Sequence, residues 1–348
     1  MRKAPARSLL LLLLPILLVS CETASYYSQA ARGQLSLLHG REDIEQLLTD
    51  PSLDEPTRAK LQLVQQALAF AEHSLQLSSG GSYRSFTALD RPFVVWNVFA
   101  AAEFSVEPTQ WCYPIAGCVS YRGYFSEQAA LRYAERLQAQ GLEVYSGGVD
   151  AYSTLGWFDD PLTSAVLRRP DHRLVALLFH ELAHQRVYVP GDTEFNESFA
   201  SFVEQEGLRR WLAQQAQADA PLLARIAREN QLQQEFVRLV ITHRDALRTL
   251  YGSDLPQAQM RESKQVLQEQ LRQDYQRWRE ASSYTGYDRW FEGPLNNAQL
   301  ATVASYHALV PFFEALLVQK QGDLPAFYEA VSALAAMPAQ ERAERVGR

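Results

Sequence analysis

Apolar positions recur with a helical period in the first part of the chain. Residues 24–50 and 55–77 repeat apolar side chains every three to four positions, and Pro56 stands where a helix commonly begins. The segment 78–85, SSGGSYRS, interrupts this period. We therefore predict a helical N-terminal part over about residues 24–80.

The pattern changes to β-branched and aromatic residues from position 92. PFVVWNVFAAAEF and CVSYRGYF read as strands, the amphipathic FSEQAALRYAERLQAQG reads as a helix, and the short GLEVYSGG reads as a further strand. The sequence thus predicts a small strand, strand, helix, strand unit in an α/β part that covers about residues 92–160.

The rest of the chain returns to a helical period. Residues 171–338 follow it almost throughout, with breaks at 190–191, 252–256 and 282–295 and near 321. This part, about residues 165–340, completes a mainly α protein with a small β-sheet, of the α+β class. With 47% hydrophobic residues, the chain can bury a large core, and we expect a single domain over residues 21–348.

The first residues have the layout of a secretory signal. Arg2, Lys3 and Arg7 precede an apolar run from Leu9 to Val19, which is too short and too close to the N-terminus for an ordinary membrane-spanning helix. We therefore exclude residues 1–20 from the fold.

The end of that run, Leu-Val-Ser-Cys, resembles the bacterial lipobox, in which the signal is cut before a cysteine that then carries lipid. A plain signal peptide cleaved elsewhere is the alternative. Several acyl chains on Cys21 would anchor the chain firmly, since each buried methylene contributes roughly 0.8 kcal/mol. Glu22 follows the cysteine and resembles an outer-membrane address. We expect a lipid-anchored protein of the bacterial outer membrane that faces the periplasm.

The charge balance argues against nucleic acid as a partner. Without residues 1–20, the chain keeps 30 Lys and Arg against 40 Asp and Glu, a balance of about −10. No basic stripe remains, and attraction to anionic lipid is not expected. The lipid itself would hold the protein at the membrane.

Two cysteines remain after Cys21. Cys112 and Cys118 are separated by five residues, and neither has the CxxC spacing of a redox or zinc site. In an exported chain, an even pair at this distance favours a local disulfide over two buried thiols.

The stretch HELAH carries the candidate chemistry. His180 and His184 are four residues apart, so on a helix both imidazoles project from one face towards one ion. A catalytic zinc takes three protein ligands and water, and Glu181 beside His180 can accept a proton from that water. The apolar LVALLF before the motif predicts a buried helix, which does not tolerate such polar groups without partners.

A third ligand is available on the next helix. Asp192 or Thr193 can cap a helix that begins near Glu194, which places Glu197 in its first turns. The segment NESFASFVE resembles the NEGFA segment of gluzincin aminopeptidases of the aminopeptidase N type, whose glutamate is the third zinc ligand. The resemblance gives Glu197 that role, although the loop from His184 is shorter than in those enzymes.

The resemblance departs at one orienting residue. Thermolysin-like enzymes place an aspartate four residues after the ligand glutamate, and Ser201 stands there in this chain. Orientation of a zinc histidine is then expected from Glu204 or Asn196. The competing interpretation, core histidines beside a solvated Glu197, is disfavoured by the combination of HExxH, the NESFA helix and export.

The segment GGVD lies about thirty residues before His180, where the same aminopeptidases carry Gly-Ala-Met-Glu-Asn on an edge strand. That resemblance implies that Asp150 binds the substrate's free amino group. Gly147 and Gly148 would let the backbone approach the peptide. The Met-Glu-Asn portion of that segment is missing from this chain. The alternative is therefore that Gly-Gly with Asp only forms an ordinary turn.

A metallopeptidase also needs a donor for the oxyanion. Tyr306 and His307 sit in a helix that Asn296 or Asn297 can cap, and Tyr306 is our first candidate. An aromatic residue in a helix contact is the alternative explanation. Tyr284 and Tyr287 are further candidate donors. His39, His73 and His243 are expected to be surface or core residues.

Several stretches together resemble a family of bacterial lipoproteins described as predicted zinc aminopeptidases. They are YYSQAARGQLSLLHGR, PIAGCVSYRGYF, GGVDAYSTLGWFDDPL, HELAH with NESFA, and NNAQL with YHALVPFFEALL. The resemblance spans most of residues 26–320. It implies a gluzincin or zincin-like metallopeptidase architecture, one zinc ion per chain and a peptide substrate. A zinc endopeptidase acting on envelope proteins or peptidoglycan peptides, and a metal-stabilised envelope lipoprotein without turnover, are the alternatives.

Overall fold

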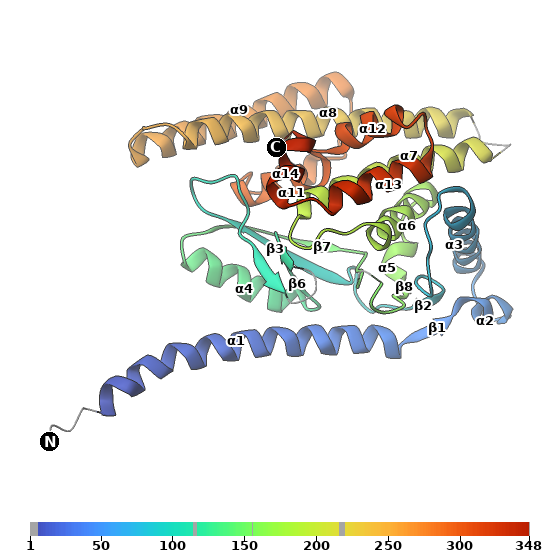
Figure 1. Cartoon of the computed structure of the whole chain (residues 1–348), viewed down its shortest axis with the longest axis horizontal. Helices are drawn as coiled ribbons and strands as arrows, with labels where there is room; N and C mark the ends of the chain where they lie inside the picture. Colours follow the sequence, from blue (N-terminus) through green and yellow to red (C-terminus); the bar gives the residue numbers. More distant parts are fainter. Residues whose placement is uncertain (1–5, 114–116, 155, 216–219, 348) are drawn as a thin grey trace.

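The computed structural model describes residues 6–113, 117–154, 156–215 and 220–347, with side chains from residue 22 onward. It is mainly helical with small sheets, which confirms the predicted α+β class. The side chain of Cys21 and those of the expected signal segment lie outside the described residues. Figure 1 shows helix α1, in blue, running along one side of the body towards the N-terminus.

The N-terminal part differs in one place from the predicted pair of helices. Its elements are α1 (Ala6–His39), β1 (Arg41–Asp43), α2 (Ile44–Thr49) and α3 (Glu55–Ser74). The helix predicted over residues 24–50 is interrupted, because the residues of β1 form a strand that pairs with β2 (Ser85–Thr87). Strand β2 pairs in turn with β8 (Leu162–Thr163). Such short strands form through distant partners and leave no period of their own. The start of α3 is as expected, with Pro56 in its first turn and Asp54 as its N-cap.

The predicted strand, strand, helix, strand unit is present. Its elements are β3 (Val95–Ala101), β6 (Arg122–Tyr124), α4 (Glu127–Ala139) and β7 (Glu143–Val149), and the antiparallel sheet has the order β6, β3, β7. Every residue of the central strand β3 is buried. Trp96 and Val98 pack in one cluster with α4, whereas Phe99 packs in another with Ala298 of α11. The sheet therefore lies between two helices.

The hairpin of β4 (Trp111–Tyr113) and β5 (Gly117–Val119) was not predicted as a separate sheet. Its strands are joined by a disulfide bond between Cys112 and Cys118, with a sulfur to sulfur distance of 2.00 Å. The hairpin forms from three residues on each side, so no alternation of polar and apolar positions marks it.

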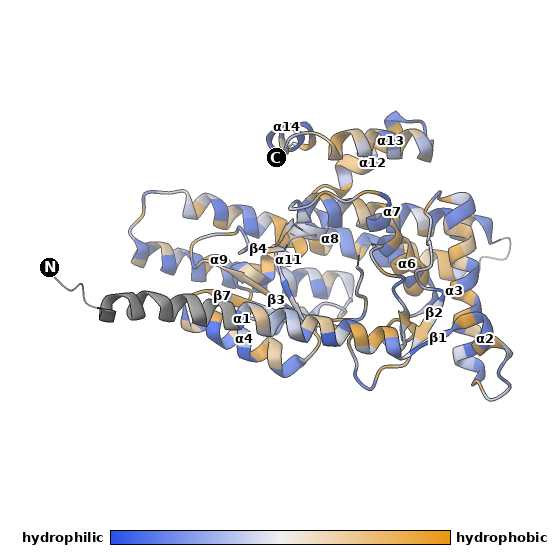
Figure 2. Ribbon diagram, turned by 60° about the horizontal axis from the view of Figure 1, so that its bottom comes forward, coloured by the Kyte–Doolittle hydropathy of each residue, from blue (hydrophilic) through white to orange (hydrophobic). Residues whose placement is uncertain are grey.

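The C-terminal part is helical, with breaks close to the predicted positions. Its elements are α5 (Ser164–Leu167), α6 (Asp171–Arg186), α7 (Thr193–Gln214), α8 (Ala220–Tyr251), α9 (Gln257–Ser282), α10 (Asp288–Phe291), α11 (Asn297–His307), α12 (Val310–Gln319), α13 (Leu324–Ala335) and α14 (Ala339–Val346). The largest hydrophobic cluster joins α3, α6, α7, α12 and α13 around Phe179, Phe199, Phe313 and Phe327. Figure 2 shows apolar residues concentrated along α6 and mainly hydrophilic ones along α9.

The segment Asn297–Gln319 is long and apolar enough, by length and composition, to cross a membrane. In the structure it is two helices, α11 and α12, whose separation was not predicted. The α11 half is part of the core: the buried Asn297 side chain donates to the carbonyl of Ala102, and the buried Gln299 side chain donates to that of Trp290. These contacts place α11 against the sheet and the helical bundle.

Candidate metal centre

Helix α6 is buried at the place where it carries the histidines. Every residue from Leu178 to His184 is buried, because α6 packs against α3 on one side and α7 on another. His180 and His184 lie one helical turn apart on the same face. The polar face that they form with Glu181 is enclosed by the protein, as HELAH within an apolar run predicts.

The turn into α7 is closed by its own side chains. Asp192 caps α7 by accepting from the backbone N–H of Phe195, and its other carboxylate oxygen lies 2.9 Å from Arg342 Nε. Asn196 donates to the carbonyl of Val189 and accepts from its N–H, both at 2.8 Å. Asn196 therefore fixes the turn rather than orienting a histidine, contrary to the second role that the sequence left open for it.

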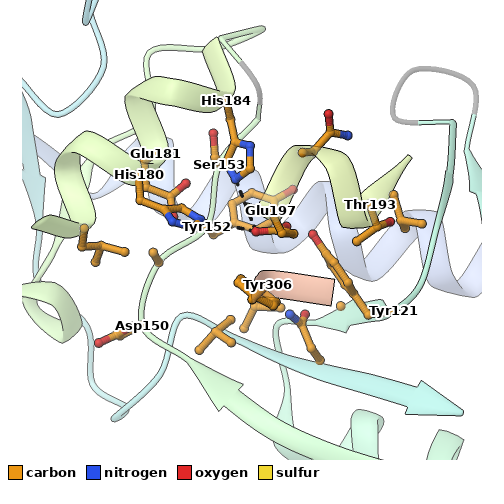
Figure 3. Close-up of a pocket in the computed structure, with 18 of the residues that line it drawn as sticks. Tyr121, Asp150, Tyr152, Ser153, His180, Glu181, His184, Thr193, Glu197 and Tyr306 are labelled. Carbon is orange, nitrogen blue, oxygen red and sulfur yellow. Dashed lines mark ion pairs between the residues drawn. The ribbon is translucent and has the colours of Figure 1, made fainter. Parts of the chain in front are cut away.

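The fold brings together the three predicted ligands. The Oε2 atom of Glu197 lies 3.3 Å from Nε2 of His180 and 3.5 Å from Nε2 of His184. One potential ligand atom from each of the three residues lies within 4.8 Å of the others, and their side chains are only 8–9% exposed. In Figure 3, the two histidines from α6 and Glu197 from α7 point towards one another.

The electrostatics of this cluster favour a cation. Burial lowers the pKa of His180, but hydrogen bonds with Glu197 and Glu204 outweigh it and raise the pKa to about 10. Burial raises the pKa of Glu197, yet attraction to His184 and hydrogen bonds with both imidazoles bring it to about 2. The donor set of two imidazole nitrogens and one carboxylate is that of a catalytic zinc site. The residues present therefore fit a divalent metal ion.

One histidine is oriented from behind by an acidic residue. The Nδ1 atom of His180 lies 3.1 Å from Oε2 of Glu204, which stands two turns after Glu197 on the same helix. A proton held on Nδ1 by this carboxylate would leave the Nε2 lone pair available to a metal ion bound between His180 and Glu197. Glu204, one of the two residues expected in this role, has the corresponding geometry.

Glu181 lines the cavity beside the cluster and is buried. Burial raises the pKa of its carboxyl group, although the neighbouring His180 and His184 act in the opposite direction. A carboxylate with a raised pKa is a better proton acceptor than an exposed one. Its position is the one expected for a general base.

A cavity of about 630 Å³ opens over this cluster. One wall consists of α6, α7 and α11, which supply the three candidate ligands, Glu181, Glu204, Tyr306 and His307. The other wall consists of α1, the β4–β5 hairpin, the sheet and the segment after β7. The volume is in the usual range for small-molecule and peptide sites.

Tyr306, the first candidate for the oxyanion donor, lies beside the cluster. Its ring stacks on that of His180 with centroids 6.2 Å apart and 18° between the planes. Burial raises the pKa of Tyr306 well above its ordinary value, and the charge of Glu197 adds to the effect. The neighbouring His307 also lines the cavity, and burial lowers its pKa to about 4.

Tyr121 was missed by the sequence interpretation. It follows the disulfide hairpin, lines the cavity and points towards Glu197 in Figure 3. Burial, followed by the charge of Glu197, raises the pKa of its phenol well above the ordinary value. The alternative donors Tyr284 and Tyr287 do not line this cavity. They belong to an aromatic cluster in which Tyr287 stacks on Phe236 with centroids 3.8 Å apart.

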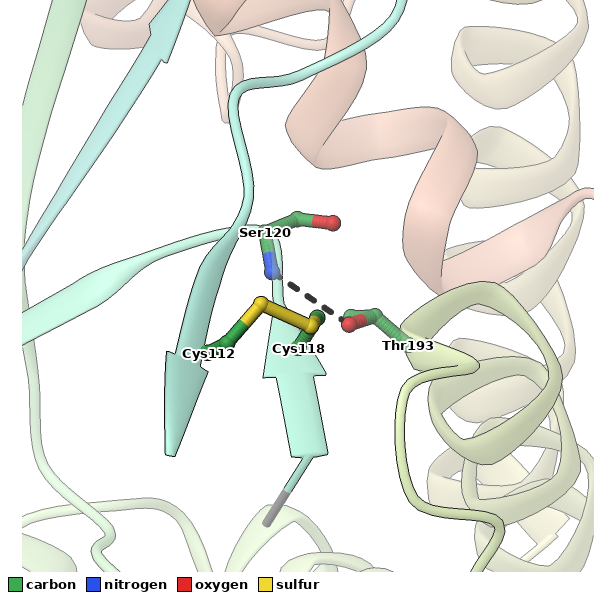
Figure 4. The surroundings of a disulfide bond; sticks show 4 residues. All are labelled: Cys112, Cys118, Ser120 and Thr193. Carbon is green, nitrogen blue, oxygen red and sulfur yellow. Dashed lines mark hydrogen bonds between the residues drawn. A yellow bond between two sulfur atoms is a disulfide. The ribbon is translucent and has the colours of Figure 1, made fainter. Parts of the chain in front are cut away.

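The hairpin that precedes Tyr121 is packed against the α6–α7 turn. A Cβ atom on Gly117 would lie 2.5 Å from the backbone nitrogen of Gly191. Next to the disulfide, the N–H of Ser120 donates to Oγ1 of Thr193, the first residue of α7 (Figure 4). The disulfide therefore stands beside the helix that carries Glu197.

The predicted role of Asp150 does not fit its surroundings. Asp150 lines the cavity, but both of its carboxylate oxygens are held by Arg169, at 2.6 Å from Nε and 2.7 Å from Nη2. Its charge is thus already paired, which the sequence gave no reason to expect because Arg169 is distant along the chain. An ammonium group would have to compete with this guanidinium.

The two glycines before Asp150 have different reasons to be small. They lie on β7, an edge strand, as the GGVD resemblance implies. A Cβ atom on Gly148 would lie 2.1 Å from the ring of Phe93, so this glycine makes room for a partly buried aromatic side chain. At Gly147 the nearest atom would be 3.7 Å away, on Tyr145. Neither glycine is among the described residues that line the cavity, so their role in binding the peptide stays a prediction.

The remaining predicted histidines lie outside the cavity. His39 and His73 are exposed, and each contacts the carbonyl of the residue four positions earlier in its own helix. His243 is buried, with Nε2 2.7 Å from a carboxylate oxygen of Asp274. They take the surface and core positions expected for them.

One of the comparisons with known proteins, a family match, agrees with the peptidase-like geometry of this site. The model of a family described as putative aminopeptidase matches residues 25–346. No curated protein and no solved structure matches the chain. The match covers α1 from residue 25 onward and both walls of the cavity, and it supports a peptidase-like function in general. The chain therefore belongs to the putative aminopeptidase family.

Proposed function

We propose that the protein is a zinc-dependent aminopeptidase that removes N-terminal residues from peptides. One observation carries the proposal: His180, His184 and Glu197 converge in the wall of a cavity large enough for a short peptide. The family match supports peptidase chemistry in general. Zinc is the expected metal because two imidazoles and a carboxylate are its usual ligands in hydrolases.

The cluster gives each residue a distinct task. His180, His184 and Glu197 would hold the metal, and Glu204 would keep the imidazole of His180 in the required tautomer. The bound ion would polarise the scissile carbonyl and make water easier to deprotonate. Glu181 accepts the proton from the attacking water and later delivers it to the leaving amine.

The oxyanion requires a donor opposite the ligands. Tyr306 stacks over His180, and Tyr121 approaches Glu197 from the other wall. Burial keeps both phenols protonated, so each can donate a hydrogen bond to a developing negative charge. We assign the main donor to Tyr306, because it lies against a metal-ligand histidine.

The charges in the cavity favour a substrate with a free amino terminus. Among the described residues that line it, four carboxylates, those of Asp150, Glu181, Glu197 and Glu204, face a single guanidinium, that of Arg169. With neutral histidines and one divalent ion, this leaves a net charge of −1. A cavity of this sign attracts an α-ammonium group.

The place of action follows from residues 1–22. We propose that the chain is anchored through lipid on Cys21 in the outer membrane and faces the periplasm. Fractionation of a Cys21→Ser protein tests this. The variant should leave the membrane fraction, and its retention there would contradict the anchor.

The test of the function is a pair of peptides that differ only at the N-terminus. The intact protein, purified in detergent without chelator, should contain one zinc per chain. It should cleave the free peptide at least ~100-fold faster than its N-acetylated twin, because the net negative charge of the cavity attracts the ammonium group and acetylation removes that group's charge. Glu181→Gln should abolish cleavage while zinc stays bound. Equal cleavage of both peptides would leave an endopeptidase, and zinc without cleavage would leave a metal-stabilised scaffold.

A further inference from the structure

The N-terminal helix contributes to the cavity that holds the candidate metal ligands. Tyr26, Tyr27 and Ala30 of α1 line it, together with residues of the sheet and of α6 and α7. In Figure 1, α1 lies along the body rather than apart from it. The part of α1 that follows Cys21, the expected anchor, therefore forms a wall of the site.

A side-chain amide fixes α1 against the sheet. The Nε2 atom of Gln29 donates to the carbonyl of Gly123 at 3.3 Å, and its Oε1 accepts from the N–H of Phe125 at 3.1 Å. Because β6 is an edge strand, these backbone groups lack a neighbouring strand on that side. The amide of Gln29 supplies the missing partner.

Further contacts hold α1 on either side of Gln29. The guanidinium of Arg122 lies 4.0 Å from the ring centroid of Tyr26, and it lies 3.6 Å from a carboxylate oxygen of Glu22. One turn after Gln29, Gly33 packs so closely on Phe125 that a Cβ atom would lie 2.1 Å from its ring. The position of Tyr26 and Tyr27 in the cavity wall is thus well determined.

The surface that α1 helps to form is aromatic. The ring of Tyr113 lies 5.7 Å from that of Tyr26 and 6.4 Å from that of Tyr27, centroid to centroid. Phe125 and Tyr152, which also line the cavity, are 5.2 Å apart. The charged residues of the cavity come mainly from the opposite wall. Tyr27 is 44% exposed although its ring belongs to this cluster.

We propose that these five aromatic residues form a substrate subsite for a large apolar or aromatic side chain of the peptide. The proposal rests on the proposed peptidase function and adds a substrate class to it: peptides with Phe, Tyr, Trp or Leu near the cleaved bond. Aromatic faces favour such side chains through apolar burial and ring contacts. The substrate would cover the exposed part of Tyr27.

Two variants of α1 separate a subsite from a structural role. Tyr27→Ala removes a ring of the cluster, whereas Leu35→Ala removes an apolar side chain of the same helix that is 54% exposed and does not line the cavity. The intact protein is assayed with Phe-Ala-Ala, Ala-Phe-Ala and Ala-Ala-Ala. Unchanged zinc content and melting temperature show that both variants are folded.

Tyr27→Ala should lower kcat/KM about five- to tenfold for one of the two phenylalanine peptides and at most about twofold for Ala-Ala-Ala. The peptide that is affected assigns the subsite to the first or second substrate residue. Leu35→Ala should leave all three rates unchanged. A Tyr27→Ala protein with unchanged rates, or with the same loss on all three peptides, would overturn the proposal.

Binding separates this inference from the proposed function. In a Glu181→Gln background, the dissociation constants of the same peptides are measured by calorimetry, with and without Tyr27→Ala. A selective five- to tenfold weakening for a phenylalanine peptide supports the subsite even if the wild-type protein cleaves nothing. If the Glu181→Gln protein that retains Tyr27 binds phenylalanine and alanine peptides equally well, the subsite is overturned. This holds even if the wild-type protein is an active aminopeptidase.

Discussion

The two walls of the cavity are built in different ways. The candidate metal ligands and Glu204 come from one stretch between His180 and Glu204, on two helices that meet at a tight turn. The opposite wall combines α1, the disulfide hairpin, the sheet and the segment after β7, which are far apart in sequence. The helical wall holds charged groups at set distances, whereas the other wall presents tyrosine rings.

This difference suggests a division of labour. Groups that share one ion must keep their relative positions to within about 0.5 Å, and a buried helical pair with a closed turn achieves this locally. Recognition of a side chain tolerates more variation, so it can depend on segments joined by a few contacts such as those of Gln29 and Arg122. Changes to the helical wall should therefore affect chemistry, and changes to the other wall should affect selectivity.

The largest effect is expected from loss of a ligand. His184→Ala removes one of the two imidazoles from a buried site, so metal content should fall to near zero and kcat/KM should fall at least about a thousandfold. Circular dichroism should still show a helical protein, because α6 is held by its apolar contacts. His39→Ala, an exposed histidine outside the cavity, is the control and should change neither property. Full zinc occupancy in His184→Ala would exclude the proposed ligand set.

The next prediction compares one tyrosine from each wall. Tyr306→Phe removes the phenol that stacks over His180 and should lower kcat about a hundredfold with little change in KM, as expected for an oxyanion donor. Tyr121→Phe should lower kcat less, by about tenfold, because Tyr121 belongs to the opposite wall, which carries the proposed aromatic subsite. Tyr287→Phe, in the separate aromatic cluster, serves as control. A larger loss of kcat in Tyr121→Phe than in Tyr306→Phe would show that Tyr121 is the main oxyanion donor.

A third prediction tests the two residues that the sequence proposed for orienting a histidine. Glu204→Gln should weaken zinc binding about 10- to 100-fold, because its carboxylate faces Nδ1 of His180. Asn196→Ala should instead lower the melting temperature and affect zinc affinity less, because Asn196 bonds to the backbone of Val189. Competition with a chelator of known affinity measures the first effect and thermal unfolding measures the second. A large loss of zinc affinity confined to Asn196→Ala would reverse these roles.

The same contrast explains what the sequence could predict. A helical period and fixed spacing placed His180, Glu181, His184 and Glu197 on facing helices, because these features depend on neighbours three or four residues apart. Glu204 also follows this spacing, two turns after Glu197. The main helices were predictable for the same reason, and the central unit of strands was predictable from its runs of β-branched and aromatic residues.

What the sequence did not reveal depends on contacts between distant segments. The pairing of Asp150 with Arg169 leaves no local signal, and it changes the meaning of the GGVD motif. The entry of Tyr121 and Tyr26 into the cavity follows from how the hairpin and α1 dock on the sheet. The strand β1 interrupts a helical period only because β2 is there to pair with it.

The smallest effect on chemistry is expected from the disulfide, which joins the two strands of the hairpin in the wall opposite the candidate ligands. Replacing Cys112 and Cys118 by serine should lower the free energy of unfolding by about 2 kcal/mol, the loop-closure entropy of so short a loop. Zinc should stay bound, because the turn between the ligand helices is closed by Asn196 and Asp192 rather than by the hairpin. The hairpin positions Tyr113 and Tyr121, so KM for aromatic peptides should rise a few-fold more than KM for Ala-Ala-Ala. Urea unfolding, zinc content and the two KM values are measured on the same preparation. Loss of zinc in the double variant would show that the hairpin holds Glu197 in place. The two walls would then not act independently, and the hydrogen bond between Ser120 and Thr193 is where they are in contact.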